Sequence, residues 1–547
     1  MYSYAPPAVC AGISSERDLV ALACALGAAE SGGPLTASER ALCRAADLAS
    51  AIPEDLKEDT GSLILQGGDP LGDILCTLRP GAQRRSQGAF YTPSAVVSPM
   101  VDWVLDQSPA RVVDPGCGSG RFTAELLRRS RSLEIWALDL DPLQTLITRA
   151  ILAVLGARNA HVLQGDYLDA ELPACEGRTA FISNPPYVRH HDLSPATKAW
   201  GAATARGLGH SFSGLAGLHA HFFLATARLG RPGDVGCFIT SAEWLDVGYG
   251  QVIRSLLLDG LGGNALHVID PSAEVFEDAQ TTAVVTCFRL GSEPAAMRVR
   301  RVSSAEQLRA LELGYEVPRA EFATSARWTA LTKPVSPEEP AGSRLGELVH
   351  VHRGMVTGAN DYFVLTRSRA SALGILPWCV PAITEGREII DSHGLIRDAP
   401  ERKLLFRPPR EIDREASPEL DAYLRLGESP AGDPRAVARR YISSHRRPWW
   451  YLGAQEPPPI VASYMARQAP VFALNRDGLA LINIGHGLYP KRKMSWRDLR
   501  RLVHYLNGAR ESFRGLGRTY QGGLEKFEPR EMEALPIAFV PGEADNG

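Results

Sequence analysis

The feature that most constrains the fold is a series of four short apolar segments, each followed by polar or glycine-rich residues. These segments cover residues 110–114, 133–139, 161–165 and 179–183. Helical periodicity separates the first three, over 122–131 and 142–155. Strands and helices that alternate at this length predict an α/β fold with a doubly wound parallel sheet. Ligands bind such sheets at the carboxyl ends of the strands, so the residues after each segment form the candidate site.

A glycine loop follows the first predicted strand, with the sequence Asp114-Pro115-Gly116-Cys117-Gly118-Ser119-Gly120. Glycines there let a ligand approach the backbone closely, and the helix N-terminus beyond them favours a negative group. The spacing departs from the dinucleotide fingerprint Gly-x-Gly-x-x-Gly because residue 121 is Arg. Asp139 ends the second strand, where an acid would bind ribose hydroxyls.

Polar residues also follow the third and fourth strands. Asp166 could accept a hydrogen bond from an adenine amino group, or it could simply cap a helix. The fourth strand ends in Asn184-Pro185-Pro186-Tyr187. Two prolines fix φ and remove two backbone donors, so local carbonyls and the Asn184 amide form a rigid acceptor pair suited to an amino group. A planar ring would stack on Tyr187; the alternative is a strand that ends in a proline turn.

Length and composition limit the other possibilities. A chain of 547 residues fits two to four domains of about 150 residues each. The nine cysteines are scattered without a Cys-x-x-Cys pair, so we expect no metal site and a cytoplasmic protein. No segment approaches the roughly 20 apolar residues that span a bilayer, so we expect no membrane association.

Four regions are predicted along the chain. Residues 1–85 form a helical N-terminal segment, with capping-box spacing between Thr36 and Glu39. Residues 86–331 form the α/β domain, in which the Gly-, Ser- and His-rich stretch 188–217 is expected to be an irregular, mobile loop. Residues 332–344 are a linker, and 345–547 a second domain of mixed α+β structure.

The charge is unevenly distributed. The chain has 59 Lys and Arg against 62 Asp and Glu, but residues 401–510 hold 20 basic residues against 11 acidic ones. A local basic surface can bind phosphates whatever the overall charge. A solvated, arginine-rich face is the alternative.

The order of these motifs resembles that of the S-adenosylmethionine-dependent DNA methyltransferases of the N6-adenine type, found in restriction-modification systems. Residues 88–93, Gly-Ala-Phe-Tyr-Thr-Pro, are similar to that family's additional cofactor motif. Its position before the glycine loop, with a recognition domain C-terminal, is the gamma arrangement of the TaqI-type enzymes. The resemblance extends strongly over residues 86–295 and loosely over 341–540, where 352–363 and 520–529 are similar to parts of target-recognition domains.

The resemblance implies a Rossmann-like fold, S-adenosylmethionine as cofactor, and transfer of its methyl group to an adenine flipped out of double-stranded DNA. Catalytic positions carried over are Asn184, Pro185, Pro186, Tyr187 and Phe276, the last as a second stacking aromatic unless it is a core residue. Cofactor positions carried over are Tyr91, Thr92, Asp114, Gly116, Cys117, Gly118, Asp139, Leu140, Asp166 and Tyr167. Among these, Asp114 would brace the loop.

Other functions share parts of this pattern. Methyltransferases that act on glutamine amides of proteins also carry Asn-Pro-Pro-Tyr. An RNA methyltransferase, a cytosine-N4 methyltransferase or a non-catalytic DNA-specificity subunit would retain the fold. The long basic C-terminal half and the intact Asn184 and Tyr187 favour a DNA enzyme. We expect a monomer, with any restriction endonuclease encoded separately. The sequence does not indicate which bases are recognised.

Overall fold

A computed structural model describes residues 12–46, 52–79, 92–270, 282–332, 343–428, 436–466, 469–513, 516–520 and 524–539. The chain divides into two compact units near residue 335. Unit 1 contains the predicted α/β domain with the N-terminal segment, and unit 2 contains most of the residues after it. Among the described residues, no helix is long and apolar enough to cross a membrane.

Unit 1 is built on a nine-stranded sheet of order β3-β2-β1-β4-β5-β7-β6-β8-β9. Its strands are β1 (Arg111–Pro115), β2 (Glu134–Asp139), β3 (Ala160–Gln164), β4 (Thr179–Ser183), β5 (Val235–Ser241), β6 (Gly263–Ile269), β7 (Ala283–Arg289), β8 (Ala296–Val302) and β9 (Tyr315–Pro318). The first five are parallel, and β7 runs antiparallel between β5 and β6. The four predicted strands that carry the motifs are therefore confirmed, and they are neighbours.

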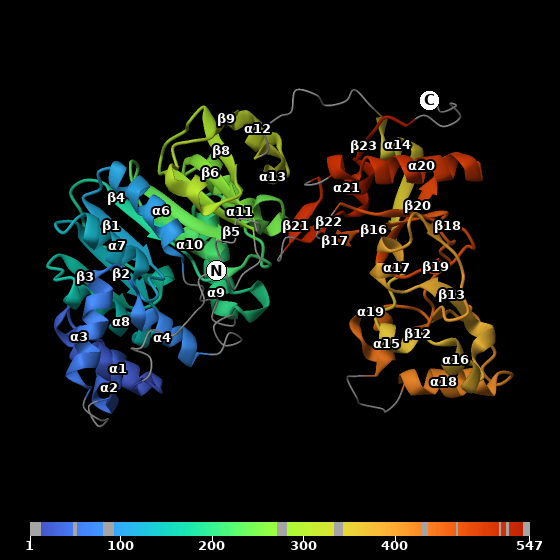
Figure 1. Ribbon diagram of the computed structural model, residues 1–547, viewed down its shortest axis with the longest axis horizontal. Helices are drawn as coiled ribbons and strands as arrows, with labels where there is room; N and C mark the ends of the chain where they lie inside the picture. The colour runs from blue at the N-terminus through green and yellow to red at the C-terminus, as the bar shows by residue number, and fades with distance from the viewer. Residues whose placement is uncertain are drawn as a thin grey trace. The chain divides into compact units, whose positions relative to one another are not determined.

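Helices cover both faces of this sheet (Figure 1). Side chains alternate across a strand, so Val112 and Ile182 pack on one face with α6 (Ser94–Asp106) and α7 (Arg121–Arg129). Val113 and Phe181 pack on the other with α10 (Leu218–Leu229) and α11 (Gln251–Leu258). Strand order reverses between β1 and β4, which makes the ends of these two strands the switch point of a doubly wound sheet.

The N-terminal segment packs on α8 (Pro142–Val154), the helix between β2 and β3. Its described residues form α1 (Glu16–Ala25), α2 (Ala37–Ala46), α3 (Glu54–Leu65) and α4 (Pro70–Leu78). The predicted capping box is present, because Thr36 N donates to Glu39 Oε2 at 2.7 Å and Glu39 N donates to Thr36 Oγ1 at 3.2 Å. Residues of α8 from Leu143 to Leu152 are all buried between the sheet and these helices.

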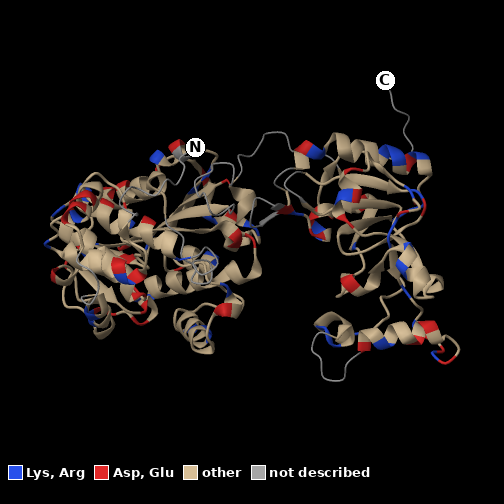
Figure 2. Cartoon of the chain, turned by 60° about the horizontal axis from the view of Figure 1, so that its bottom comes forward, with Lys and Arg blue, Asp and Glu red and all other residues tan. Residues whose placement is uncertain are grey.

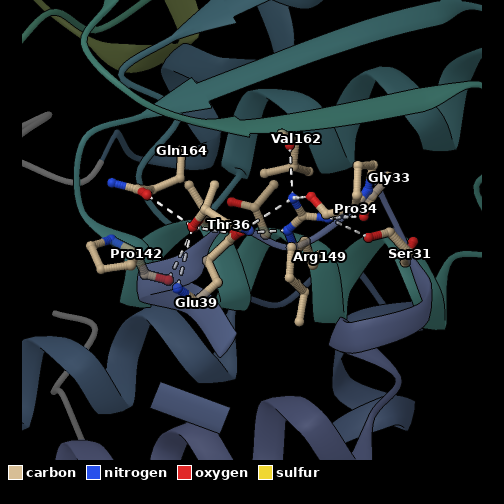
Figure 3. A network of polar contacts seen from close by, with 12 residues as sticks. Ser31, Gly33, Pro34, Thr36, Glu39, Pro142, Arg149, Val162 and Gln164 are labelled. Atoms are coloured by element: carbon tan, nitrogen blue, oxygen red, sulfur yellow. Dashed lines mark hydrogen bonds and ion pairs between the residues drawn. The ribbon is translucent and has the colours of Figure 1, made fainter. Parts of the chain in front are cut away.

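Burial of α8 places a charge in the interior (Figure 3). Arg149 has no exposed side-chain surface, and its Nε lies 2.8 Å from Oε1 of the equally buried Glu39. The remaining guanidinium donors reach the carbonyl oxygens of Ser31, Gly33, Pro34 and Val162 at 2.7–3.2 Å. A buried guanidinium is tolerated only when its donors are satisfied, so this network joins the N-terminal segment to α8 and β3.

The structure corrects the prediction of an irregular stretch over 188–217. Residues Pro195–Gly207 form α9, a 13-residue helix. Ser194 caps it by accepting from Thr197 N, and Pro195 occupies the first turn, where the missing N–H costs nothing. The composition obscured this signal, because Gly, Ser and Ala dominate the flanking residues.

Unit 2 mixes short strands with helices, as predicted. Its largest sheet has the order β11-β20-β16-β18-β14, formed by β11 (Val349–Arg353), β20 (Gly485–Pro490), β16 (Ile460–Ser463), β18 (Phe472–Asn475) and β14 (Leu395–Ile396). A second sheet contains β12 (Val364–Leu365), β15 (Leu404–Phe406), β13 (Cys379–Ile383) and β19 (Ala480–Leu481). The longest helices among its described residues are α20 (Trp496–Gly508) and α18 (Pro418–Glu428). Residues 333–342 of the predicted linker lie outside the described residues, while Ser343–Arg344 form β10, paired with Pro536–Ile537.

Candidate active site

A cavity of about 660 Å³ opens at the carboxyl ends of β1, β2, β3 and β4. Ten of the predicted site residues line it: Thr92, Gly116, Cys117, Gly118, Asp139, Leu140, Asp166, Tyr167, Asn184 and Pro186. The volume is in the range of sites for small molecules and cofactors. The topology of the sheet therefore brings together residues that are far apart in the sequence.

The glycine loop is shaped by left-handed backbone conformations. Gly116, Gly118 and Gly120 have φ of 69°, 58° and 83°. The loop is held down by Gly116 N and Cys117 N, which both donate to the carbonyl of Leu138 on β2. A Cβ on Gly116 would meet the Phe222 ring at 3.4 Å. Glycine at 116 thus keeps this wall of the cavity open and permits the turn.

Asp139 joins the loop to the end of β2. Its Oδ2 accepts from Gly118 N, and its Oδ1 accepts from Asp141 N, each at 2.9 Å. Desolvation of this carboxyl raises its pKa to about 6, although the backbone N–H bonds work in the opposite direction. The carboxylate is therefore preorganised at the cavity wall and titrates close to neutral pH.

Asp114 lies behind the loop and does not line the cavity. It is fully buried, and its Oδ2 accepts from the backbone N and the Oγ1 of Thr123 at 3.2 and 2.8 Å. The side chain thus ties the end of β1 to the first turn of α7. Burial raises its pKa to about 7. Burial also raises the pKa of the Cys117 thiol well above its ordinary value, so this cysteine is a neutral wall residue.

Asn184 ends β4 beside the loop. Its Nδ2 donates to Oγ1 of the buried Thr92 at 3.0 Å, which fixes the direction in which the amide plane faces. Ser183 Oγ donates to the carbonyl of Pro115 at 2.6 Å, so the ends of β4 and β1 are joined directly. Pro185 is buried, and Pro186 and Tyr187 are half-buried. Burial raises the pKa of the Tyr187 phenol, which keeps it neutral.

Of the remaining predicted site residues, three line the cavity and two lie outside the described residues. Asp166 Oδ1 caps a short 3-10 helix by accepting from Leu168 N at 2.9 Å. The helix cap that the sequence allows for Asp166 is therefore present, and the residue also lines the cavity. Tyr167 is buried, and its hydroxyl lies 2.9 Å from Thr226 Oγ1. Leu140 is 66% exposed at the rim of the cavity. Tyr91 and Phe276 lie outside the described residues.

Sequence reasoning missed several residues of the site. Phe222 lines the cavity and packs against Tyr167 with ring centroids 5.1 Å apart, but it lies in an apolar helix where nothing distinguishes it. Arg121, the residue that interrupts the dinucleotide fingerprint, donates through Nε to Asp69 at 2.6 Å. Asp69 also accepts from Ser119 Oγ at 2.5 Å. The N-terminal segment thus braces the glycine loop through a long-range contact that spacing cannot reveal.

Comparison with known proteins agrees with this architecture. Three family models match: "N-6 DNA Methylase" over residues 69–216, "Eco57I restriction-modification methylase" over 171–276, and "Type II methyltransferase M.Eco57I, C-terminal domain" over 332–546. The solved structure of the Type IIL restriction-modification enzyme MmeI in complex with DNA aligns with a TM-score of 0.54 at 13% identity, and covers 85% of this chain and 69% of MmeI. The fold of unit 1 is that of an α/β methyltransferase.

Two curated relatives are similar along most of the chain. Type II methyltransferase M.XamI of Xanthomonas campestris pv. amaranthicola is 39% identical over 535 residues, which are 96% of this chain and 98% of M.XamI. Type II methyltransferase M.AccI of Acinetobacter calcoaceticus is 24% identical, over 82% of this chain and 85% of M.AccI. The chain belongs to the N6-adenine DNA methyltransferase family of Type II restriction-modification systems.

Proposed function

We propose that the protein transfers a methyl group from S-adenosylmethionine to the N6 amino group of an adenine that is flipped out of duplex DNA. The observation that carries this proposal is the placement of Asn184 at the cavity. Its amide is held by Thr92, and the same cavity is lined by the glycine loop and Asp139. An acceptor for an amino group and a site for a nucleoside-containing cofactor thus share one space.

The residues present fit S-adenosylmethionine. Gly116 and Gly118 leave room for a ligand against the loop, and the Asp139 carboxylate would accept from ribose hydroxyls. Thr92 and the loop amides would hold the methionine end, and Asp166 the adenine amino group. Cys117, Leu140 and Tyr167 line the same cavity and complete the proposed binding surface. Tyr91 is a further predicted contact, which lies outside the described residues. When bound, the cofactor supplies an electrophilic methyl group on a sulfonium sulfur.

Asn184 and Pro185 would prepare the nucleophile. The lone pair of adenine N6 is delocalised into the ring, which makes the amino group a poor nucleophile. The Asn184 side-chain oxygen and the Pro185 carbonyl would accept its two N–H bonds, which favours a more tetrahedral nitrogen. Positioning and preorganised dipoles would supply most of the rate enhancement.

Aromatic stacking would stabilise the flipped base. Extruding a base from the duplex costs a few kcal/mol. Stacking on Tyr187, and on Phe276 as the predicted second aromatic, would offset part of this at about 1–3 kcal/mol for each base–aromatic contact. Pro186 would keep the turn rigid between the acceptor and the ring.

The chain order supports the gamma arrangement. The additional motif at 88–93 precedes the glycine loop, and unit 2 follows the catalytic residues as a proposed target-recognition domain. A monomeric, cytoplasmic enzyme with a separately encoded restriction endonuclease stays a prediction.

A pH dependence of cofactor affinity is expected from Asp139. Its pKa of about 6 means that the carboxylate is ionised above pH 7 and protonated below pH 5. The protonated form accepts hydroxyl bonds less well, so affinity should rise with pH through 6 and be about tenfold weaker at pH 5 than at pH 8. Calorimetric titration across this range measures the effect. Asp139→Asn should bind weakly with a flat profile; a slope retained in this variant would assign the titration to another group.

A substrate-class assay tests the proposed function. Purified protein is incubated with labelled S-adenosylmethionine and, separately, with duplex DNA, RNA, and a protein that presents exposed glutamine amides. We expect label in DNA only. Label in protein or RNA but not in DNA would establish one of the alternative methyltransferase functions, and cofactor binding without transfer would indicate a specificity subunit.

A further inference from the structure

We propose that a basic groove on unit 2 binds the sugar-phosphate backbone of duplex DNA. The groove has a volume of about 1000 Å³ and lies where α20 packs over β14 and β18, at the edge of the five-stranded sheet. The proposal rests on DNA as the substrate. It names a contact surface that the methyl-transfer chemistry itself does not require.

Arginine dominates the lining of the groove. Five arginines contribute to it: Arg397, Arg476, Arg497, Arg500 and Arg510. Two exposed histidines, His393 and His504, add further nitrogen donors. None of the described residues that line the groove is Asp or Glu. A concave surface of one charge sign concentrates its potential and attracts a polyanion.

The two faces of α20 explain how these arginines are presented. Leu499, Leu502, Val503 and Leu506 are buried in the core of unit 2. Arg497, Arg500 and His504 follow at spacings of three and four residues, so they share one face of the helix, and all three are exposed. At 1.5 Å per residue this row extends over about 10 Å, which suits an extended anion better than a single phosphate.

Several other arginines of unit 2 are neutralised by carboxylates or donate within the fold. Arg414 bonds to Asp421 and Glu428, and Arg440 to Asp361. Arg446 donates to the backbone carbonyls of Val356 and Thr357.

Four of the five groove arginines differ from these, whereas Arg510 donates to the backbone carbonyl of Ala469 at 3.1 Å. Within the described part of the chain, no carboxylate forms an ion pair with Arg397, Arg476, Arg497 or Arg500. Basic and acidic residues are otherwise interspersed over both units (Figure 2). Among the described residues, these four groove arginines therefore carry charge that no carboxylate neutralises.

Trp496 favours a nucleic acid as the occupant. Its ring is 46% exposed in the groove, and the Arg476 guanidinium lies 5.1 Å from the ring centroid. This cation–π contact restrains the guanidinium at the groove. Guanidinium groups bind phosphates through paired N–H bonds. Trp and Arg are also enriched at protein–protein interfaces, but four arginines in one concave surface without an acidic lining residue favour a polyanion as the occupant.

The test compares two charge reversals of equal size. Arg497→Glu with Arg500→Glu changes the groove. Lys491→Glu with Lys493→Glu is the matched control, because both lysines are exposed, belong to unit 2 and do not line the groove. Fluorescence anisotropy with a 30-base-pair duplex gives the affinity of the full-length protein at several salt concentrations. Calorimetry gives its affinity for S-adenosylmethionine.

We expect the groove variant to bind the duplex at least about tenfold more weakly than the unchanged protein. The steepness of its plot of log K against log salt concentration should fall by about 2, because two phosphate contacts are lost and each contributes about 0.9. The control should change by less than about threefold, and cofactor affinity should be unchanged in both. Should the glutamate pair prevent folding, Arg497→Gln with Arg500→Gln should lower the slope similarly.

Three results would overturn the proposal. One is equal loss in the groove and control variants, and another is an unchanged slope in the groove variant. The third is retained duplex binding together with lost binding to poly-glutamate or to RNA, which would assign the groove to another polyanion. In each case methyl transfer to DNA by the unchanged protein leaves the proposed function standing. Failure of the unchanged protein to bind and methylate any duplex refutes that function instead.

Discussion

Asn184→Ala is expected to reduce methyl transfer to DNA by at least about 100- to 1000-fold, which is the scale for removing one preorganised dipole from a developing charge. The acceptor for the target amino group is lost, while the glycine loop and Asp139 are untouched. Cofactor affinity should therefore stay within about threefold of the unchanged protein. Single-turnover transfer of labelled methyl groups and calorimetric titration measure the two quantities.

Thr92→Val provides the matched control. It removes the hydrogen bond between Thr92 and Asn184 but retains the amide and the shape of the side chain. A neutral hydrogen bond contributes about 0.5–1.5 kcal/mol, so we expect a loss of about tenfold or less. Transfer by Asn184→Ala at the rate of the unchanged protein would refute the role given to Asn184. Equal losses of methyl transfer in Asn184→Ala and Thr92→Val would show that Asn184 contributes only to the packing of the site.

Arg149→Met is expected to destabilise unit 1 by about 3–5 kcal/mol, because it leaves the Glu39 carboxylate buried without its ion-pair partner. Among the described residues, the Glu39 carboxylate would then accept hydrogen bonds only from Thr36 N and Thr145 Oγ1. Urea denaturation followed by circular dichroism measures the free energy of unfolding. If the N-terminal segment detaches first, the unfolding transition should become biphasic.

The exposed pair of Lys57 and Glu54 provides the comparison, with side-chain exposures of 39% and 69%. Lys57→Met should change the free energy of unfolding by less than about 1 kcal/mol, because exposed ion pairs contribute little. The double variant Arg149→Met with Glu39→Met should be more stable than Arg149→Met alone, since it removes the stranded charge. A loss below about 1 kcal/mol for Arg149→Met would show that the network does not hold the segment in place.

Much of unit 1 was predictable because strands and helices alternate there with clear periodicity. β1, β2, β3 and β4 lie within one residue of their predicted positions, and their order places Asp139 and Asn184 at one cavity. Local patterns specify such elements, and the rules of parallel sheets specify where their ends meet.

What could not be predicted depends on contacts between distant residues. Asp69 reaches Ser119 and Arg121 from the N-terminal segment, and no spacing rule connects them. Phe222 looks like any core residue of an apolar helix. Missing α9 was a different error, because Ser194-Pro195 is a readable helix start that the surrounding composition outweighed.

Identification of the methylated nucleoside tests the central claim most directly. Duplex DNA is incubated with the protein and S-adenosylmethionine, digested to nucleosides and analysed by mass spectrometry. The account predicts N6-methyldeoxyadenosine as the product, absent when Asn184→Ala replaces the unchanged protein. N4-methyldeoxycytidine, or DNA without any methylated base under conditions where the cofactor binds, would contradict it.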